Sequence, residues 1–303
     1  MAINEKTRVA SHEPAGPGYR FLVLDAPQLA AQLVPGQFVH VKVPALEASA
    51  LRRPFSVFDA DNGQVTLLYK NVGRGTAALN KVLPGETVEV LGPLGHGFPE
   101  KCKGVPLLVG GGYGVAPLYF LAKRLTATPK GRGYQDDYRD KPGNGNEAGD
   151  ESRGRDGNGN EAGDDVGAMR KPILFVGGRT KEDLLALDRF AALGVEARIA
   201  TNDGSAGVKG FVTDPLDDAL IELRQKNEPF ELFTCGPDGL LKAVAQRATG
   251  TGMPGWISMD RHMVCGVGAC FACIQKIKLP NGEVYNARCC VNGPVFAAAD
   301  IVW

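Results

Sequence analysis

The sequence has 303 residues, 34 Lys plus Arg against 34 Asp plus Glu, and 44% hydrophobic residues. This length accommodates two or three domains with their own cores, and the balanced charge gives no indication of a nucleic-acid partner or an anionic membrane surface. No apolar run is long enough to span a bilayer, and the first residues lack the apolar segment of a signal peptide, so we expect a cytoplasmic protein with no membrane attachment.

Short apolar runs separated by turn residues fill residues 1–100. Antiparallel strands joined by tight turns produce this pattern, so we expect a small antiparallel β-barrel. The expected strands begin at Tyr19, Gln37, Val65 and Thr87, with turns at Pro35-Gly36, Asp61-Asn62-Gly63 and Pro84-Gly85.

Two segments of this region suit phosphate and ring binding. Arg53-Pro54-Phe55-Ser56 combines a guanidinium that can bind a pyrophosphate with a flat aromatic ring. Tyr69-Lys70 precedes Gly73-Arg74-Gly75-Thr76, which opens an expected helix whose free N–H groups suit a phosphate. Each motif alone is a weak signal, because Arg-Pro-x-Ser is also typical of the start of a strand and a lone Gly-x-Gly is more often a turn.

Residues 101–252 show a repeating strand and helix pattern. A buried strand from Val105 runs into Gly110-Gly111-Gly112-Tyr113-Gly114 and then into an expected helix. This is the order of a dinucleotide site, although the glycine spacing differs from G-x-G-x-x-G, and a tight structural turn is the alternative. Further strands are expected at Ile173, at Val195 and at Phe230, the last ending in Cys235-Gly236-Pro237. The pattern predicts a mostly parallel sheet covered on both faces, with ligands at the carboxyl ends of its strands.

Residues 130–168 interrupt this pattern with a polar insertion. Gly143–Asp150 recurs as Gly157–Asp164, and the segment is rich in Gly, Asn, Asp, Glu and Arg. Because it has so few apolar residues to bury, we expect a disordered surface insertion.

The last part of the chain, residues 253–303, carries most of the cysteines. Cys265, Cys270 and Cys273 have the C-x4-C-x2-C spacing of plant-type iron–sulfur proteins, and the pair Cys289-Cys290 follows. Gly266 and Gly268 suit a loop that wraps a cluster closely. A zinc site and disulfides are the alternatives. Structural zinc sites usually have two C-x2-4-C pairs, which this spacing does not match, and disulfides need an oxidising compartment, which the absence of a signal peptide does not indicate.

Arg-Pro-x-Ser, the Gly-rich turn and Cys-Gly-Pro, in this order, resemble the ferredoxin–NADP reductase superfamily up to about residue 250. The resemblance implies a flavin on the barrel and a nicotinamide cofactor between the Gly110 turn and Cys235. The implied cofactor-binding residues are Arg53, Pro54, Phe55, Ser56, Tyr69, Lys70, Gly73, Gly75, Thr76, Gly110, Gly111, Gly112, Gly114, Gly236 and Pro237, with Cys235 as the candidate catalytic residue.

With the tail included, nearly the whole chain is similar to the electron transfer subunit of type B dihydroorotate dehydrogenase. The register Arg288-x-Cys290-x-x-Gly293-Pro294 implies Cys290 rather than Cys289 as the fourth ligand beside Cys265, Cys270 and Cys273. The implied cofactors are FAD, a 2Fe-2S cluster and NAD. The implied partner is an FMN-containing catalytic subunit in a heterotetramer of two plus two, and this chain alone is not expected to oxidise dihydroorotate. In that family, electrons pass from FMN through the cluster and FAD to NAD in pyrimidine biosynthesis.

The chain departs from the family pattern in its insertion, in Cys289, and in Phe55, where many superfamily members carry Tyr. Two other functions stay open: a flavin and iron–sulfur subunit that feeds ferredoxin, sulfur or hydrogen chemistry, and a zinc-stapled binding protein. NAD and NADP are also both open, since Arg179 suits a 2′-phosphate and Asp203 suits a ribose hydroxyl.

Overall fold

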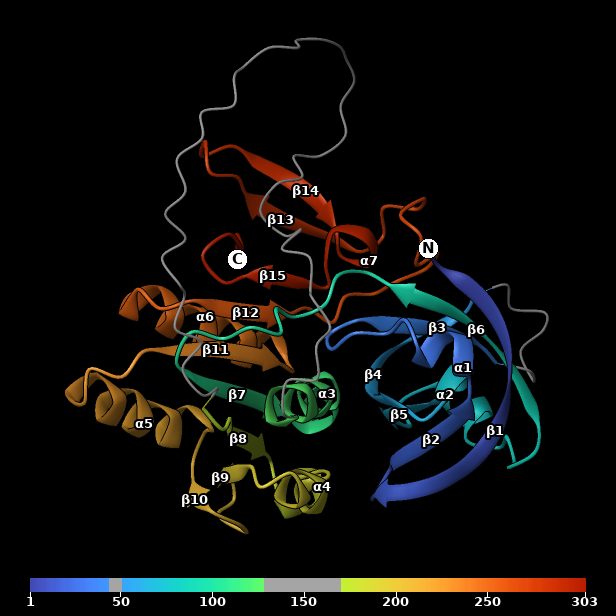
Figure 1. The fold of residues 1–303 in the computed structure, drawn as a ribbon, viewed down its shortest axis with the longest axis horizontal. Coiled ribbons are helices and arrows are strands. Elements are labelled where there is room, and N and C mark those ends of the chain that lie inside the picture. Colours follow the sequence, from blue (N-terminus) through green and yellow to red (C-terminus); the bar gives the residue numbers. More distant parts are fainter. Residues whose placement is uncertain (44–50, 128–169) are drawn as a thin grey trace, which may run out of the picture.

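The computed structural model describes residues 1–43, 51–127 and 170–303, so the insertion expected at 130–168 lies outside the described residues. The chain forms a barrel, a larger sheet with helices on both faces, and a small C-terminal module (Figure 1). This architecture confirms the expected multidomain combination of an antiparallel β-barrel and a parallel-sheet α/β domain. Within the described ranges, no helix is both long and apolar enough to cross a membrane.

Six antiparallel strands close the barrel in the order β1-β2-β5-β4-β3-β6. Side chains alternate across its wall, so that Val39 and Val41 of β3 lie in the barrel core while Phe38 packs into a cluster shared with the larger sheet. The barrel elements are β1 (Ile3–Gly16), β2 (Tyr19–Asp25), α1 (Pro27–Ala30), β3 (Phe38–Lys42), β4 (Arg53–Asp61), β5 (Gln64–Lys70), α2 (Arg74–Leu79) and β6 (Thr87–Leu94).

The larger sheet has seven strands in the order β10-β9-β8-β7-β11-β12-β15, all parallel except β15. Its strands are β7 (Val105–Gly111), β8 (Ile173–Gly178), β9 (Glu196–Thr201), β10 (Val208–Lys209), β11 (Phe230–Cys235), β12 (Gly255–Ser258) and β15 (Val295–Ala297). Its helices are α3 (Val115–Thr126), α4 (Leu187–Ala192), α5 (Thr213–Gln225) and α6 (Asp238–Thr251), with 3-10 turns at Gly112–Gly114 and Lys181–Asp183.

The two faces of this sheet are covered by different helices. Leu108 of β7 shares an apolar cluster with residues of α3 and α4, whereas its neighbour Leu107 shares another cluster with residues of α5 and α6. Helix α3 also joins the sheet to the barrel, because the Tyr119 ring stacks on Phe58 of β4 at 4.2 Å between centroids. The barrel therefore packs beside the carboxyl end of β7, where ligands were expected.

The C-terminal module extends from the larger sheet and returns to it. It comprises the antiparallel hairpin of β13 (Ile274–Lys278) and β14 (Val284–Arg288), followed by helix α7 (Cys289–Asn292) and β15. Strand β15 pairs antiparallel with β12, so the module completes the edge of the larger sheet. The expected domain division at residues 252 and 253 stays a prediction.

Candidate functional site

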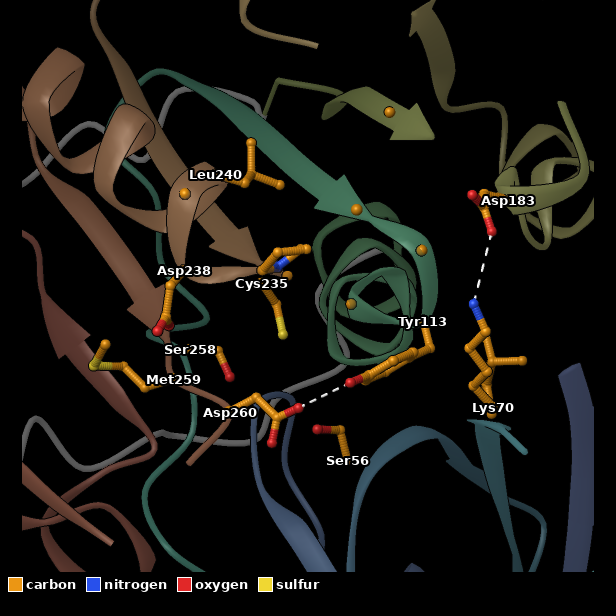
Figure 2. A pocket seen from close by; sticks show the side chains of 18 of the residues that line it. Ser56, Lys70, Tyr113, Asp183, Cys235, Asp238, Leu240, Ser258, Met259 and Asp260 are labelled. Carbon is orange, nitrogen blue, oxygen red and sulfur yellow. Dashed lines mark hydrogen bonds and ion pairs between the residues drawn. The ribbon is translucent and has the colours of Figure 1, made fainter. Parts of the chain in front are cut away.

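A cavity of about 1160 Å³ lies where the barrel and the larger sheet meet. It is large enough for ligands of dinucleotide size, since typical small-molecule pockets measure roughly 300 to 1,000 Å³. Twelve of the expected cofactor or catalytic residues line it: Pro54, Phe55, Ser56, Tyr69, Lys70, Thr76, Gly111, Gly112, Gly114, Cys235, Gly236 and Pro237. Residues from distant parts of the sequence thus share one site (Figure 2).

The barrel side of the cavity is formed by the start of β4 and the end of β5. The rings of Phe55 and Tyr69 lie edge to face at 5.5 Å between centroids. Tyr69 also bonds His12 through its hydroxyl at 2.8 Å, and burial raises its pKa to about 12, so this ring stays neutral. These two rings give the cavity a rigid aromatic wall.

Three residues expected on the barrel side do not line the cavity. A Cβ placed on Gly75 would lie 2.5 Å from Nε of Arg53, so this glycine allows the Arg53 side chain to pass beneath helix α2. The Arg53 guanidinium donates to the carbonyl of Leu51 at 2.8 Å. Gly73 is the residue before α2, and its N–H donates to the hydroxyl of Thr76. Their contacts with a flavin stay predictions.

The sheet side is formed by the turns that follow β7 and β11. These strands are neighbours, with Gly110 opposite Cys235. A Cβ on Gly114 would collide with the carbonyl oxygen of Cys235 and lie 2.6 Å from its carbonyl carbon, so only glycine permits this approach of the two turns. Gly110 instead packs against helix α3, since a Cβ there would lie 2.8 Å from Val115, and it does not line the cavity.

Cys235 is buried at the bottom of this side of the cavity. Burial raises the pKa of its thiol to about 12, and the carboxylate of Asp260 adds to the rise. The side chain is therefore a neutral thiol at physiological pH, which can contact a ligand ring but does not act as a thiolate nucleophile.

The cavity also contains polar contacts that no sequence motif indicated. The hydroxyl of Tyr113 donates to Asp260 at 3.1 Å, which ties the Gly-rich turn to the segment after β12 (Figure 2). Asp183 accepts from the Tyr19 hydroxyl at 3.0 Å and lies 4.0 Å from Nζ of Lys70. Both contacts connect segments far apart in the sequence, so only the folded chain reveals them.

Asp183 also holds Arg179, one of the two residues considered for cofactor selection. The Arg179 side chain donates from Nε to Asp183 at 3.0 Å, and this bond contributes most to lowering the pKa of the carboxyl group. Asp203, the other residue, accepts from the backbone and hydroxyl of Ser205. Both groups are thus engaged with protein partners.

The cysteine triplet lies in the loop between β12 and β13, and Cys290 lies on α7. The N–H of Cys290 donates to the sulfur of Cys273 at 3.4 Å, so the fourth expected ligand lies beside the triplet. Gly266 and Gly268 have φ of +70° and +83°. A Cβ on Gly268 would lie 2.7 Å from Val291, so this glycine lets the loop lie against α7. Cys289 is fully buried in the apolar core of the module.

The loop also favours a thiolate at its first cysteine. Burial alone would raise the pKa of Cys265, but N–H groups of Val267, Ala269 and Cys270 and the Cys270 thiol donate to it and lower the pKa to about 6. Within the described ranges, no three His, Cys, Asp or Glu side chains form a group that could hold a single metal ion. A two-iron cluster spreads four thiolates over two irons, and the four cysteines fit that donor set.

Comparison with known proteins gives matches to both ends of the chain. Residues 5–98 match the oxidoreductase FAD-binding domain, and residues 260–302 match the iron-sulfur cluster binding domain of dihydroorotate dehydrogenase B. A solved chain from an NADH-dependent reduced ferredoxin–NADP oxidoreductase is 27% identical, with a TM-score of 0.73 over 98% of this chain and 90% of that chain.

Two curated relatives are similar over almost their whole length. The dihydroorotate dehydrogenase B (NAD(+)) electron transfer subunit of Bacillus caldolyticus is 38% identical over 88% of this chain and 86% of its own. The subunit of the same name from Geobacillus sp. strain WCH70 is 36% identical over 100% of both chains. The chain therefore belongs to the family of electron transfer subunits of dihydroorotate dehydrogenase B.

Proposed function

We propose that this chain transfers electrons between the catalytic subunit of a type B dihydroorotate dehydrogenase and NAD+. One observation carries the proposal: a single chain combines a large cavity between a barrel and a parallel sheet with a loop of three cysteines that lies beside a fourth, Cys290 of α7. As a family member it is an oxidoreductase subunit that binds FAD and an iron–sulfur cluster and uses NAD.

Flavin, when bound, exchanges hydride with a nicotinamide and single electrons with an iron–sulfur cluster, so a chain with both of these sites needs it. The barrel side of the cavity suits the flavin. Phe55 presents a flat apolar face, while Lys70 and the start of α2 at Thr76 suit its phosphates. Phe55 lacks a hydroxyl, so it binds by packing alone.

The sheet side suits the nicotinamide nucleotide. The glycines of the turn Gly111–Gly114 and the turn at Gly236-Pro237 expose backbone to the cavity, while the large side chain of Tyr113 is held toward Asp260 by its hydroxyl. The neutral thiol of Cys235 can pack against the nicotinamide without forming a covalent bond with it. We assign Cys235 to this contact in the proposed site.

Cys265, Cys270, Cys273 and Cys290 are the proposed ligands of the cluster, which we assign as 2Fe-2S from the ligand spacing. The proposed domains are residues 1–100 for FAD, 101–252 for NAD and 253–303 for the cluster. The family matches at residues 5–98 and 260–302 support the first and the last of these ranges.

The loop that carries the cluster ligands is also the proposed docking site of the catalytic subunit. Val264, Val267 and Phe271 are 40%, 54% and 61% exposed in this loop, which is unusual for apolar side chains so close together in sequence. We propose an FMN-containing partner in a heterotetramer of two plus two, with these side chains covered by the partner.

The test is to purify the chain alone, reconstitute it with FAD and iron, and compare two reactions. We expect reduction of a small dye by NADH, because that needs only the cavity, and no formation of orotate from dihydroorotate. Adding the catalytic subunit should produce orotate-forming, NAD-dependent activity. Orotate formation by the isolated chain, or a colourless protein after reconstitution, would overturn the proposal.

A flavin and iron–sulfur subunit that serves ferredoxin is the second candidate, because the ferredoxin–NADP oxidoreductase chain covers 98% of this chain. Its identity of 27% is lower than the 38% of the dihydroorotate dehydrogenase subunit. Reduction of a ferredoxin at a higher rate than electron exchange with the catalytic subunit would favour this second candidate.

A further inference from the structure

His40 lies in the middle of β3, on the outer side of the barrel wall. Its neighbours Val39 and Val41 fill the barrel core, so the His40 side chain points the other way, as Phe38 does, with the two rings 5.6 Å apart. The backbone of β3 pairs with Pro54 of β4 and Leu91 of β6 at this position. His40 is nevertheless fully buried, with 0% of its surface exposed.

The loop between β12 and β13, which carries Cys265, Cys270 and Cys273 and is called the cluster loop below, covers the His40 ring. A Cβ placed on Gly266 would lie 2.5 Å from Cε1 of His40 and 2.8 Å from each ring nitrogen. Gly266 follows Cys265 directly in the sequence. The imidazole therefore lies between the barrel, which has the proposed flavin residues, and the loop with three of the four proposed cluster ligands.

Neither ring nitrogen of His40 has a hydrogen-bond partner among the described residues. Burial lowers the pKa of His40 to about 4, so the ring is neutral and carries one N–H donor. A buried donor without a partner is destabilising, and such groups in proteins usually have a partner. An apolar side chain would fill the same space without leaving a donor unpaired. The ring N–H of His40 therefore indicates a hydrogen-bond acceptor that is not part of the protein.

We propose that His40 is a positioning residue of the electron-transfer site, whose ring N–H donates a hydrogen bond to a sulfur of the iron–sulfur cluster or of Cys265. The proposal rests on the cluster assignment made above. Sulfur atoms of such clusters accept hydrogen bonds, and these bonds are among the features that set the reduction potential. A donated hydrogen bond stabilises the reduced cluster more than the oxidised one, because the reduced cluster has more negative charge.

The experiment measures the reduction potential of the cluster in the reconstituted chain, by redox titration followed with electron paramagnetic resonance. For His40→Leu we expect the equilibrium constant for reduction to fall about tenfold, which is a potential about 59 mV more negative for a one-electron couple. His40→Gln retains an N–H donor and should stay closer to the wild-type potential than His40→Leu.

Two controls separate a hydrogen bond from packing. Leu91→Ala removes packing directly across from His40 on β6 without removing a donor, and it should leave the potential unchanged. In protein labelled with 15N-histidine, the reduced cluster should show a nitrogen coupling that His40→Leu abolishes. An unchanged potential in His40→Leu, or the same potential in His40→Gln as in His40→Leu, would overturn the inference. If His40→Leu takes up no iron, an equal loss of iron in His40→Gln would overturn it as well. A wild-type chain that takes up no iron would instead overturn the cluster assignment itself.

Discussion

Gly114 offers a direct test of the proposed nicotinamide side of the cavity, through the substitution Gly114→Ala. The added methyl would meet the backbone of the turn after β11: the carbonyl oxygen of Cys235, its carbonyl carbon at 2.6 Å, and Cα of Gly236 at 2.8 Å. The φ of Gly114 is −62°, which alanine adopts freely, so the contact alone causes the effect. Because every atom in the contact is backbone, no side-chain rotation can relieve it.

The turn after β11 must therefore move away from the turn after β7. Overpacking of this kind costs about 1 to 3 kcal/mol of unfolding free energy. A misplacement of roughly 1 Å at a reacting group can lower the rate about 100-fold, so we expect kcat/KM for NADH-dependent dye reduction to fall between about 10-fold and 100-fold. The visible absorption of flavin and cluster should be retained, because neither site includes this contact.

The assay is steady-state dye reduction by NADH, together with denaturant unfolding and a visible spectrum. Gly250→Ala is the matched control, since this glycine lies in helix α6 and an added Cβ would have nothing within 4 Å. Alanine is favoured over glycine within a helix by about 0.5 to 1 kcal/mol, so the control should be slightly stabilised and fully active. A wild-type kcat/KM in Gly114→Ala would refute the assignment of this turn to the nicotinamide.

Three further predictions concern the cluster and the nucleotide. Cys290→Ser should lose most of the bound iron, whereas Cys289→Ser should keep it. The reverse pattern of iron content would make Cys289, rather than Cys290, the fourth cluster ligand. Gly266→Ala should also lower iron content, because the residue has φ of +70° and its Cβ would collide with His40; full loading would contradict this. Asp183→Ala should free Arg179 and raise kcat/KM for NADPH relative to NADH by about two- to fivefold, since an ion pair with an exposed guanidinium is weak; an unchanged ratio would exclude Arg179 from cofactor selection.

Most strands that could be predicted from the sequence have apolar residues at their buried positions. Strand β7 is an example, with Leu107, Leu108 and Val109 all fully buried. Strand β4 was not expected, because Val57 and Phe58 are buried in succession where a register shift breaks the alternation. The first strand, β1, was not predicted because two of its buried positions are polar: Glu5 accepts N–H groups at the start of α1, and Thr7 donates to a carbonyl of β6. Apolar alternation fails as a signal where a buried polar side chain has its own partners.

The candidate site could be predicted where a motif contains both the ligand-facing residues and the turn that presents them. The Gly-rich turn and Cys-Gly-Pro are such motifs, and the structure brings them together. Asp183, Asp260 and His40 could not be predicted, because each becomes significant only through a contact with a residue distant in the sequence. A single sequence contains no record of such contacts.

The position of the C-terminal module indicates how the chain keeps its cofactor sites at a fixed separation. Cys273, Ile277 and Cys289 belong to the same apolar cluster as Leu107 and Leu232 of the larger sheet, so the module shares a core with that sheet. On its other side the module meets the barrel, where the N–H of His96 bonds the carbonyl of Gly293. Because the module is bound to the larger sheet by buried packing and to the barrel by a backbone hydrogen bond, we expect electron transfer between the two proposed sites to proceed without domain motion.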